Sequence, residues 1–80
     1  MDRINAELTR AKEKWPGWPT DPIHAASVLT EEVGELVQAC NDFCYSGGDI
    51  SRMEAECVQV AAMAMRFLEG LPGYQRIQGY

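Results

Sequence analysis

The sequence has no long apolar run and few basic residues. No stretch approaches the roughly 20 apolar residues of a membrane-spanning helix, and the opening Met1-Asp2-Arg3 begins no apolar signal segment. Seven Lys and Arg face twelve Asp and Glu, which gives a net charge of -5. Such a chain does not attract a nucleic-acid backbone or an anionic membrane. We therefore expect a cytoplasmic protein whose partners include neither nucleic acid nor membrane.

Cysteine and histidine are also scarce, with three cysteines and one histidine. Cys40, Cys44 and Cys57 fall in apolar helical patterns, which is typical of reduced thiols in a core. An open alternative is a zinc site formed by these cysteines and His24, although their spacing matches no standard zinc pattern.

Two common motifs of phosphate and iron chemistry are missing. Gly47-Gly48 lacks the other glycine and the lysine of a P-loop. There is no Glu-x-x-His pair of the kind that holds iron in a helical bundle. Any phosphate group would have to bind through a metal ion or through scattered cations.

Length and composition favour one small globular domain, residues 1–80. The chain is 46% hydrophobic and 24% charged, which is ordinary for a globular protein. A chain of 80 residues buries only roughly 60% of its unfolded surface, so its stability alone would be marginal.

Apolar periodicity predicts a first helix over about residues 2–14. The periodic positions are Ile4, Leu8, Ala11 and Trp15. Pro16 ends this helix, and residues 15–20 contain two prolines and a glycine, which predicts an irregular connector.

The second predicted helix covers about residues 22–45, because Asp21 is an N-cap residue and Pro22 suits the first helical position. Its apolar seam is formed by Ala26, Leu29, Val33, Leu36, Cys40 and Phe43. Ser51 and Glu54 resemble a capping box that starts a third helix, over about residues 52–69. A tail follows at residues 70–80, either docked or frayed.

The third helix is apolar nearly all round, since only Gln59 and Arg66 interrupt residues 57–68. Such a helix must be buried nearly all round, and two other helices cover only one side. We expect the side with Val58, Ala61, Ala62 and Met65 to meet another copy, in a homodimer or homotetramer. The alternative is that the C-terminal tail folds back over this side.

Acidic residues flank the apolar faces of the second and third helices. Glu32 and Glu35 lie about 60° and 120° from the centre of the seam, and Glu56 lies about 40° from the apolar centre of its helix. An unpaired carboxylate there needs a proton or a cation. One interpretation is a buried salt bridge from Glu56 to Arg52 or Arg66. The other is a divalent cation with oxygen ligands, of which magnesium fits best.

The same acidic residues form a pattern that resembles a known family. Residues 31–35 read Glu-Glu-Val-Gly-Glu and residues 56–59 read Glu-Cys-Val-Gln. This pattern is similar to the motif Glu-Glu-x-x-Glu, a gap, then Glu-x-x-Asp of the MazG-like all-alpha nucleoside triphosphate pyrophosphohydrolases. The similarity covers about residues 25–68. It implies an all-α helical bundle with MazG-like packing, completed by homo-oligomerisation, that hydrolyses an NTP or dNTP to the monophosphate and pyrophosphate.

The resemblance also implies a magnesium site, at which manganese can substitute, with Glu32, Glu35 and Glu56 as ligands. Glu31 is typical of the family without being an assured ligand. Gln59 stands where the family has aspartate, and its amide offers an oxygen without a charge. Gln59 could bind the metal directly, bind through water, or contact the substrate instead. Glu35 and Glu56 are the expected catalytic residues, and Glu35 would accept the proton of the attacking water.

Four residues are candidates for substrate binding. Arg66 lies on the flank of Glu56 and Lys14 precedes the connector, so both could meet phosphate oxygens. Trp15 or Trp18 could stack on a base. Their plainer interpretations are surface charges and core aromatics.

A function of another class also fits these residues. The chain could be a noncatalytic nucleotide-binding, oligomerisation or regulatory module whose acidic residues form salt bridges between helices. Gln59 favours nucleotide binding without turnover.

Overall fold

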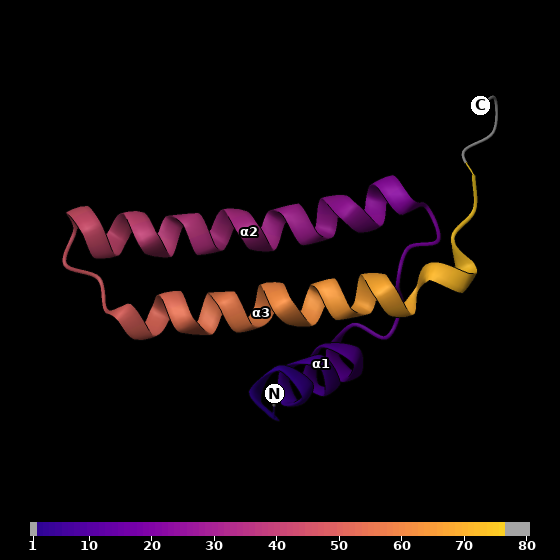
Figure 1. Ribbon diagram of the computed structural model, residues 1–80, viewed down its shortest axis with the longest axis horizontal. Coiled ribbons are helices and arrows are strands. Elements are labelled where there is room, and N and C mark those ends of the chain that lie inside the picture. Colours follow the sequence, from indigo (N-terminus) through magenta and orange to yellow (C-terminus); the bar gives the residue numbers. More distant parts are fainter. Residues whose placement is uncertain (1, 77–80) are drawn as a thin grey trace.

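The computed structural model describes residues 2–76 and consists of helices and short connections (Figure 1). In chain order the elements are α1 (Asp2–Lys14), α2 (Pro22–Tyr45), α3 (Ile50–Glu69) and the short 3-10 helix η1 (Leu71–Gly73). α2 and α3 form a long antiparallel hairpin. The predicted all-α fold class is confirmed. None of the described helices has the length and apolar character needed to cross a membrane.

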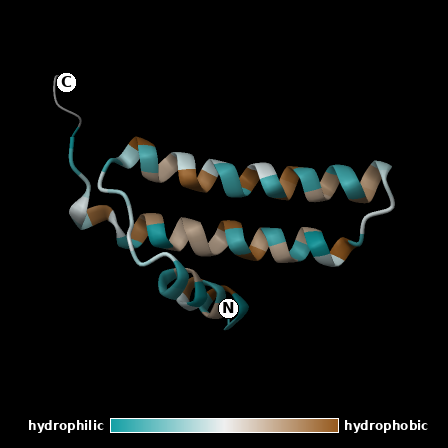
Figure 2. Ribbon diagram, turned by 180° about the vertical axis from the view of Figure 1, so that it is seen from behind, coloured by the Kyte–Doolittle hydropathy of each residue, from teal (hydrophilic) through white to brown (hydrophobic). Residues whose placement is uncertain are grey.

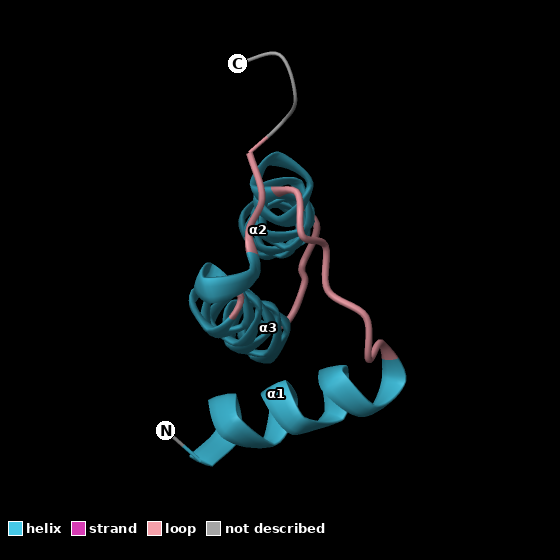
Figure 3. Ribbon diagram, turned by 90° about the vertical axis from the view of Figure 1, so that its right-hand side faces the viewer, coloured by secondary structure: helices cyan, strands magenta, loops and turns pink. Residues whose placement is uncertain are grey.

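α3 is the middle layer of the molecule, with α2 on one side and α1 on the other (Figure 3). Within the described residues, the backbone of α1 contacts α3 but not α2. Side chains of α1 that extend past α3 can therefore lie beside residues of α2.

The bounds predicted for the first two helices are confirmed. The side chain of Asp21 accepts hydrogen bonds from the backbone N–H groups of Ile23 and His24, at 2.9 and 3.4 Å. Pro22 occupies the first turn. These contacts satisfy N–H groups that have no partner within the helix, so α2 begins at Pro22.

The start predicted for the third helix is wrong by two residues, because Asp49 rather than Ser51 is its N-cap. The Asp49 side chain accepts a hydrogen bond from the Ser51 N–H at 2.8 Å. Glu54, which the capping box would have turned back to the helix start, instead pairs with Arg3 of α1. α3 therefore begins at Ile50.

The core of a single chain is thin. Its buried apolar residues are Leu8, Ala11, Ala25, Ala39, Ala62 and Met63, and no large side chain of the described residues is fully buried. The radius of gyration is 14.5 Å, above the roughly 12 Å of a compact chain of this length. Figure 2 shows apolar segments along both α2 and α3, whereas α1 is mostly hydrophilic.

α1 covers part of the surface that the sequence assigned to another copy. Ala62 is fully buried and forms a cluster with Leu8 and Ala11 of α1, against which Met65 packs. That expectation is therefore wrong for Ala62, because α1 covers it where this helix crosses α3.

The described part of the tail docks onto the connector between α1 and α2. The Trp18 indole N–H donates to the Tyr74 hydroxyl at 2.9 Å, and that hydroxyl donates to the Phe67 carbonyl at 2.8 Å. The backbone N–H of Gln75 donates to the Thr20 carbonyl at 2.9 Å. Of the two alternatives for the tail, docking is confirmed for residues 70–76, and residues 77–80 lie outside the described residues.

Tyr74→Phe tests this docking. The change removes a half-buried hydroxyl that makes two hydrogen bonds, so we expect a loss of about 1–3 kcal/mol in the free energy of unfolding. Urea denaturation followed by circular dichroism measures it. Tyr45→Phe is the control, because Tyr45 is exposed. Equal unfolding midpoints for both variants would contradict the assignment.

Candidate metal centre

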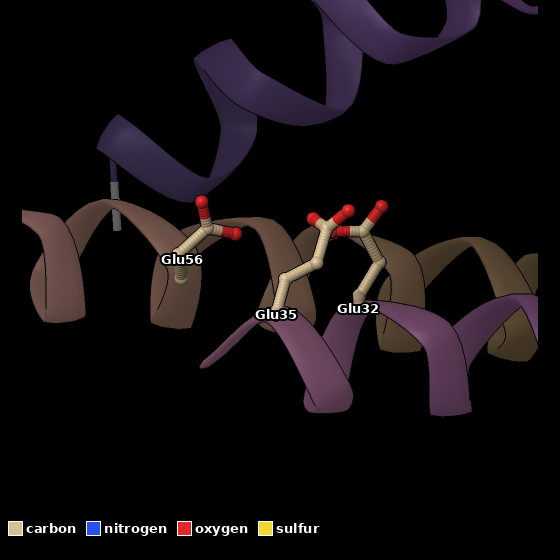
Figure 4. A group of neighbouring side chains, drawn as sticks. All are labelled: Glu32, Glu35 and Glu56. Atoms are coloured by element: carbon tan, nitrogen blue, oxygen red, sulfur yellow. The ribbon is translucent and has the colours of Figure 1, made fainter. Parts of the chain in front are cut away.

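Three glutamates from two helices meet at one point. Glu32 and Glu35 are one helical turn apart on α2, and Glu56 comes from the facing part of α3. One carboxylate oxygen from each residue lies within 4.8 Å of the others. The three side chains point toward α1 (Figure 4). The structure thus brings together the three carboxylates that the sequence predicted as metal ligands.

Water reaches this cluster only in part. Glu32 and Glu56 are half-buried, and the Oε2 atom of each is buried without a hydrogen-bond partner. Burial raises the pKa of Glu32, and Glu35 raises it further by its charge and by a hydrogen bond with Glu32. The charges of Glu56 and Glu7 act in the same direction. The cluster therefore favours a proton or a cation.

The salt-bridge interpretation of Glu56 finds no support among the described residues. Arg52 pairs with Asp42 instead, and this pairing lowers the Asp42 pKa. Arg66 is buried, with an exposed fraction of 6%. It lies 4.9 Å from the centroid of the Trp18 ring and donates to the Gly17 carbonyl at 3.3 Å. Both arginines that could have neutralised Glu56 are engaged elsewhere.

The donor set fits a hard divalent cation. Carboxylate oxygens are the ligands that magnesium and manganese prefer, and magnesium commonly keeps several waters beside one or two carboxylates. The unpaired oxygens of Glu32 and Glu56 are two such donors, and Glu35 adds a more exposed one. The residues present therefore fit a magnesium ion.

The zinc alternative is wrong. His24 and Cys40 lie 16 residues apart on α2, which corresponds to about 24 Å along a helix. Among the described residues, only the three glutamates gather closely enough to form a metal-ligating group of three. The cysteines are free thiols, but the expectation that they lie in the core is wrong for Cys44 and Cys57, which are exposed.

A cavity of about 440 Å³ opens beside the carboxylates, between the connector, α1 and the hairpin. Its walls include five residues predicted for metal or substrate binding, namely Trp15, Trp18, Glu32, Gln59 and Arg66. Lys14 does not line this cavity. Its ammonium group lies 5.7 Å from the centroid of the Trp15 ring.

The two tryptophans differ in their freedom. Trp15 is 64% exposed, so its ring is available to a ligand. Trp18 is half-buried, and its N–H donates a hydrogen bond to the Tyr74 hydroxyl. The guanidinium of Arg66 stacks on its ring. Trp18 thus shapes the cavity, and Trp15 is the better candidate for stacking on a base.

Two charged residues of this cavity, Glu7 and Arg10 of α1, were not predicted from the sequence. Arg10 donates to Glu7 through Nη2 at 2.6 Å and through Nε at 3.1 Å. The sequence did carry one signal, because Glu7 precedes Ala11 by four residues and so shares a helix face with it. Its importance becomes visible only once α1 is placed across α3.

Compared with known proteins, the chain matches no family model, no curated protein and no solved structure. The function is therefore inferred from the chemistry of the carboxylates and of the cavity beside them.

Glu32→Gln tests whether the buried carboxylate destabilises the metal-free protein. Because the Glu32 pKa is raised in the folded state, the folded chain binds more protons than the unfolded chain between the two pKa values. Stability should therefore fall as pH rises through that window and stay low above it. We expect a higher melting temperature for Glu32→Gln at pH 7 in EDTA, and a difference that shrinks toward pH 4.

Thermal melts from pH 4 to pH 8 measure this difference. Glu31→Gln is the control, since Glu31 is the exposed neighbour of Glu32 in the same helix. A Glu32→Gln variant that is less stable than the natural chain at pH 7 would contradict this interpretation.

Proposed function

We propose that this protein is a magnesium-dependent nucleoside triphosphate pyrophosphohydrolase, which hydrolyses an NTP or dNTP to the monophosphate and pyrophosphate. One observation carries the proposal. Three carboxylates, two of them with buried and unpaired oxygens, cluster together, and one of them, Glu32, lines a cavity with an exposed indole ring. The sequence pattern of these carboxylates resembles the MazG-like motif, and this resemblance names the reaction.

The chain's own charge explains why a cation is needed. A triphosphate is strongly anionic and would be repelled by Glu32, Glu35 and Glu56. Magnesium, or manganese in its place, would be held by these three side chains and would neutralise the phosphate oxygens and favour formation of the nucleophile. This requirement agrees with the missing P-loop.

Protein groups perform the remaining tasks. Glu35 is the most exposed of the three carboxylates and would accept the proton of an attacking water. Gln59 lines the cavity and offers both an N–H donor and an oxygen acceptor to the substrate or to water. Trp15 stacks on the base. Arg66, held on Trp18, adds positive charge to the wall facing the phosphates.

A second candidate function is nucleotide binding without hydrolysis, and Gln59 favours it. The neutral amide gives the centre one negative charge fewer than the aspartate of the family motif would. Weaker binding of the cation would leave nucleotide binding intact and slow the hydrolysis step.

The proposed enzyme is also a homo-oligomer, at least a homodimer. Its copies pack together through the face of the hairpin opposite the carboxylates. Exposed apolar residues of α2 and α3 share this face, which we call the hairpin face. They are Val33, Val37, Cys44, Ile50, Cys57 and Leu68. Val37 is 52% exposed and Leu68 is 63% exposed, which is unusual for large apolar side chains on one side of a small domain.

The size of the hairpin face suits a second copy. Two helices side by side, each about 30 Å long and 10 Å across, present roughly 600 Å² per copy. A symmetric pair would bury about 1,200 Å² in total, which is the lower end of stable interfaces. A dimer would also compensate for the thin core of the single chain.

Release of pyrophosphate tests the activity. We expect the natural protein to release it from at least one of a panel of canonical and modified nucleoside triphosphates, with magnesium and not with EDTA. Glu56→Gln should lower the rate about 100-fold or more, because it removes a metal ligand. Glu13→Gln, which removes an exposed carboxylate of α1, is the control. No release from any nucleotide, followed by release from Gln59→Asp, would instead support the binding protein.

Val37→Glu tests the hairpin face. A charge at the centre of an apolar interface should shift the protein to monomer in analytical ultracentrifugation, with at least a tenfold weaker dimerisation constant. Ser27→Glu places the same charge on an exposed part of α2 away from this face and should leave the assembly unchanged. A dimer unaffected by Val37→Glu would show that another surface is used.

A further inference from the structure

We propose that Glu7 of α1 is a fourth carboxylate of the metal centre and supplies the negative charge that Gln59 does not. This inference rests on the proposed function, because it concerns the same cation. It adds a residue from a helix outside the acidic pattern of the sequence.

The position of Glu7 is fixed by the core. The neighbouring Leu8 and Ala11 are buried against α3, so α1 cannot turn without exposing them. Glu7 is on the edge of that buried face, and its side chain is only 17% exposed. The three clustered carboxylates point toward α1 (Figure 4).

Glu7 and Gln59 share two cavities. Both line the cavity of about 440 Å³ that includes Glu32. Both also line a smaller one of about 310 Å³ between α1 and α3. Glu7 and Gln59, the position at which the family motif has its aspartate, therefore face the same two cavities.

Glu7 lies beside the three clustered carboxylates rather than among them. The group of three carboxylates within 4.8 Å does not include Glu7. Glu7 thus acts on the cation by charge and through water, as a positioning residue rather than a direct ligand.

Arg10 holds this carboxylate in place. Its guanidinium donates to both oxygens of Glu7, through Nε to Oε1 at 3.2 Å and through Nη2 to Oε2 at 2.6 Å. An ionised carboxylate has about four acceptor sites, so these bonds leave others free to accept from water near the cation.

Binding of Mn²⁺ alone tests the inference, with free Mn²⁺ measured by electron paramagnetic resonance and no nucleotide present. We expect Glu7→Gln to weaken Mn²⁺ binding about tenfold, as loss of a supporting carboxylate does at other metal sites. Gln59→Asp added to Glu7→Gln should restore the affinity. Glu13→Gln, which removes an exposed carboxylate of the same helix, should leave it unchanged.

The outcomes separate this inference from the proposed function. Equal affinity of the natural chain and Glu7→Gln would overturn the inference alone. A loss that Gln59→Asp does not restore would also overturn it, because Glu7 would then support only the fold through Arg10. If the natural chain and Glu32→Gln both fail to bind Mn²⁺, the metal centre itself is wrong.

Discussion

Repulsion among like charges is the constraint on which this structure depends. Glu32, Glu35 and Glu56 are held together because α2 and α3 pack closely, with Ala25 and Ala39 fully or almost fully buried. The small alanine side chains allow this approach, and the approach leaves carboxylate oxygens without partners. A protein with so thin a core has little stability to offset that cost. Either a proton or the proposed cation would remove this repulsion.

The helices were predictable because their signals are local. Apolar spacing, the Asp21 cap and the prolines of the connector act within a few residues, so α1 and α2 were bounded correctly. The start of α3 was missed because two neighbouring residues, Asp49 and Ser51, are both good caps. Sequence alone did not show that Glu54 had a partner on α1.

The site was predictable in part for the same reason. A spacing of three residues places Glu32 and Glu35 on one helix face, and burial of Glu56 follows from its apolar neighbours. Glu7 and Arg10 were missed because their place depends on how α1 crosses α3. The predicted apolar seam of α2 is buried only in part, because Val33 and Phe43 are 40% and 44% exposed whereas Ala25 and Ala39 are buried. Spacing identifies an apolar face but not which part of it the single chain covers.

The way α1 is attached couples the conformation of the molecule to ligand binding. Among the described helices, its backbone contacts only α3. The buried side chains of Leu8 and Ala11 and the ion pairs of Arg3 with Glu54 and Lys12 with Glu69 hold it there. Detachment of α1 is therefore an opening that needs less free energy than unfolding of the hairpin. Since the carboxylates face α1, anything bound between them and this helix stabilises the closed form, and by reciprocity a tighter hold on α1 strengthens that binding. Amide hydrogens of α1 would then exchange with solvent at a rate that reports how fully the centre is occupied.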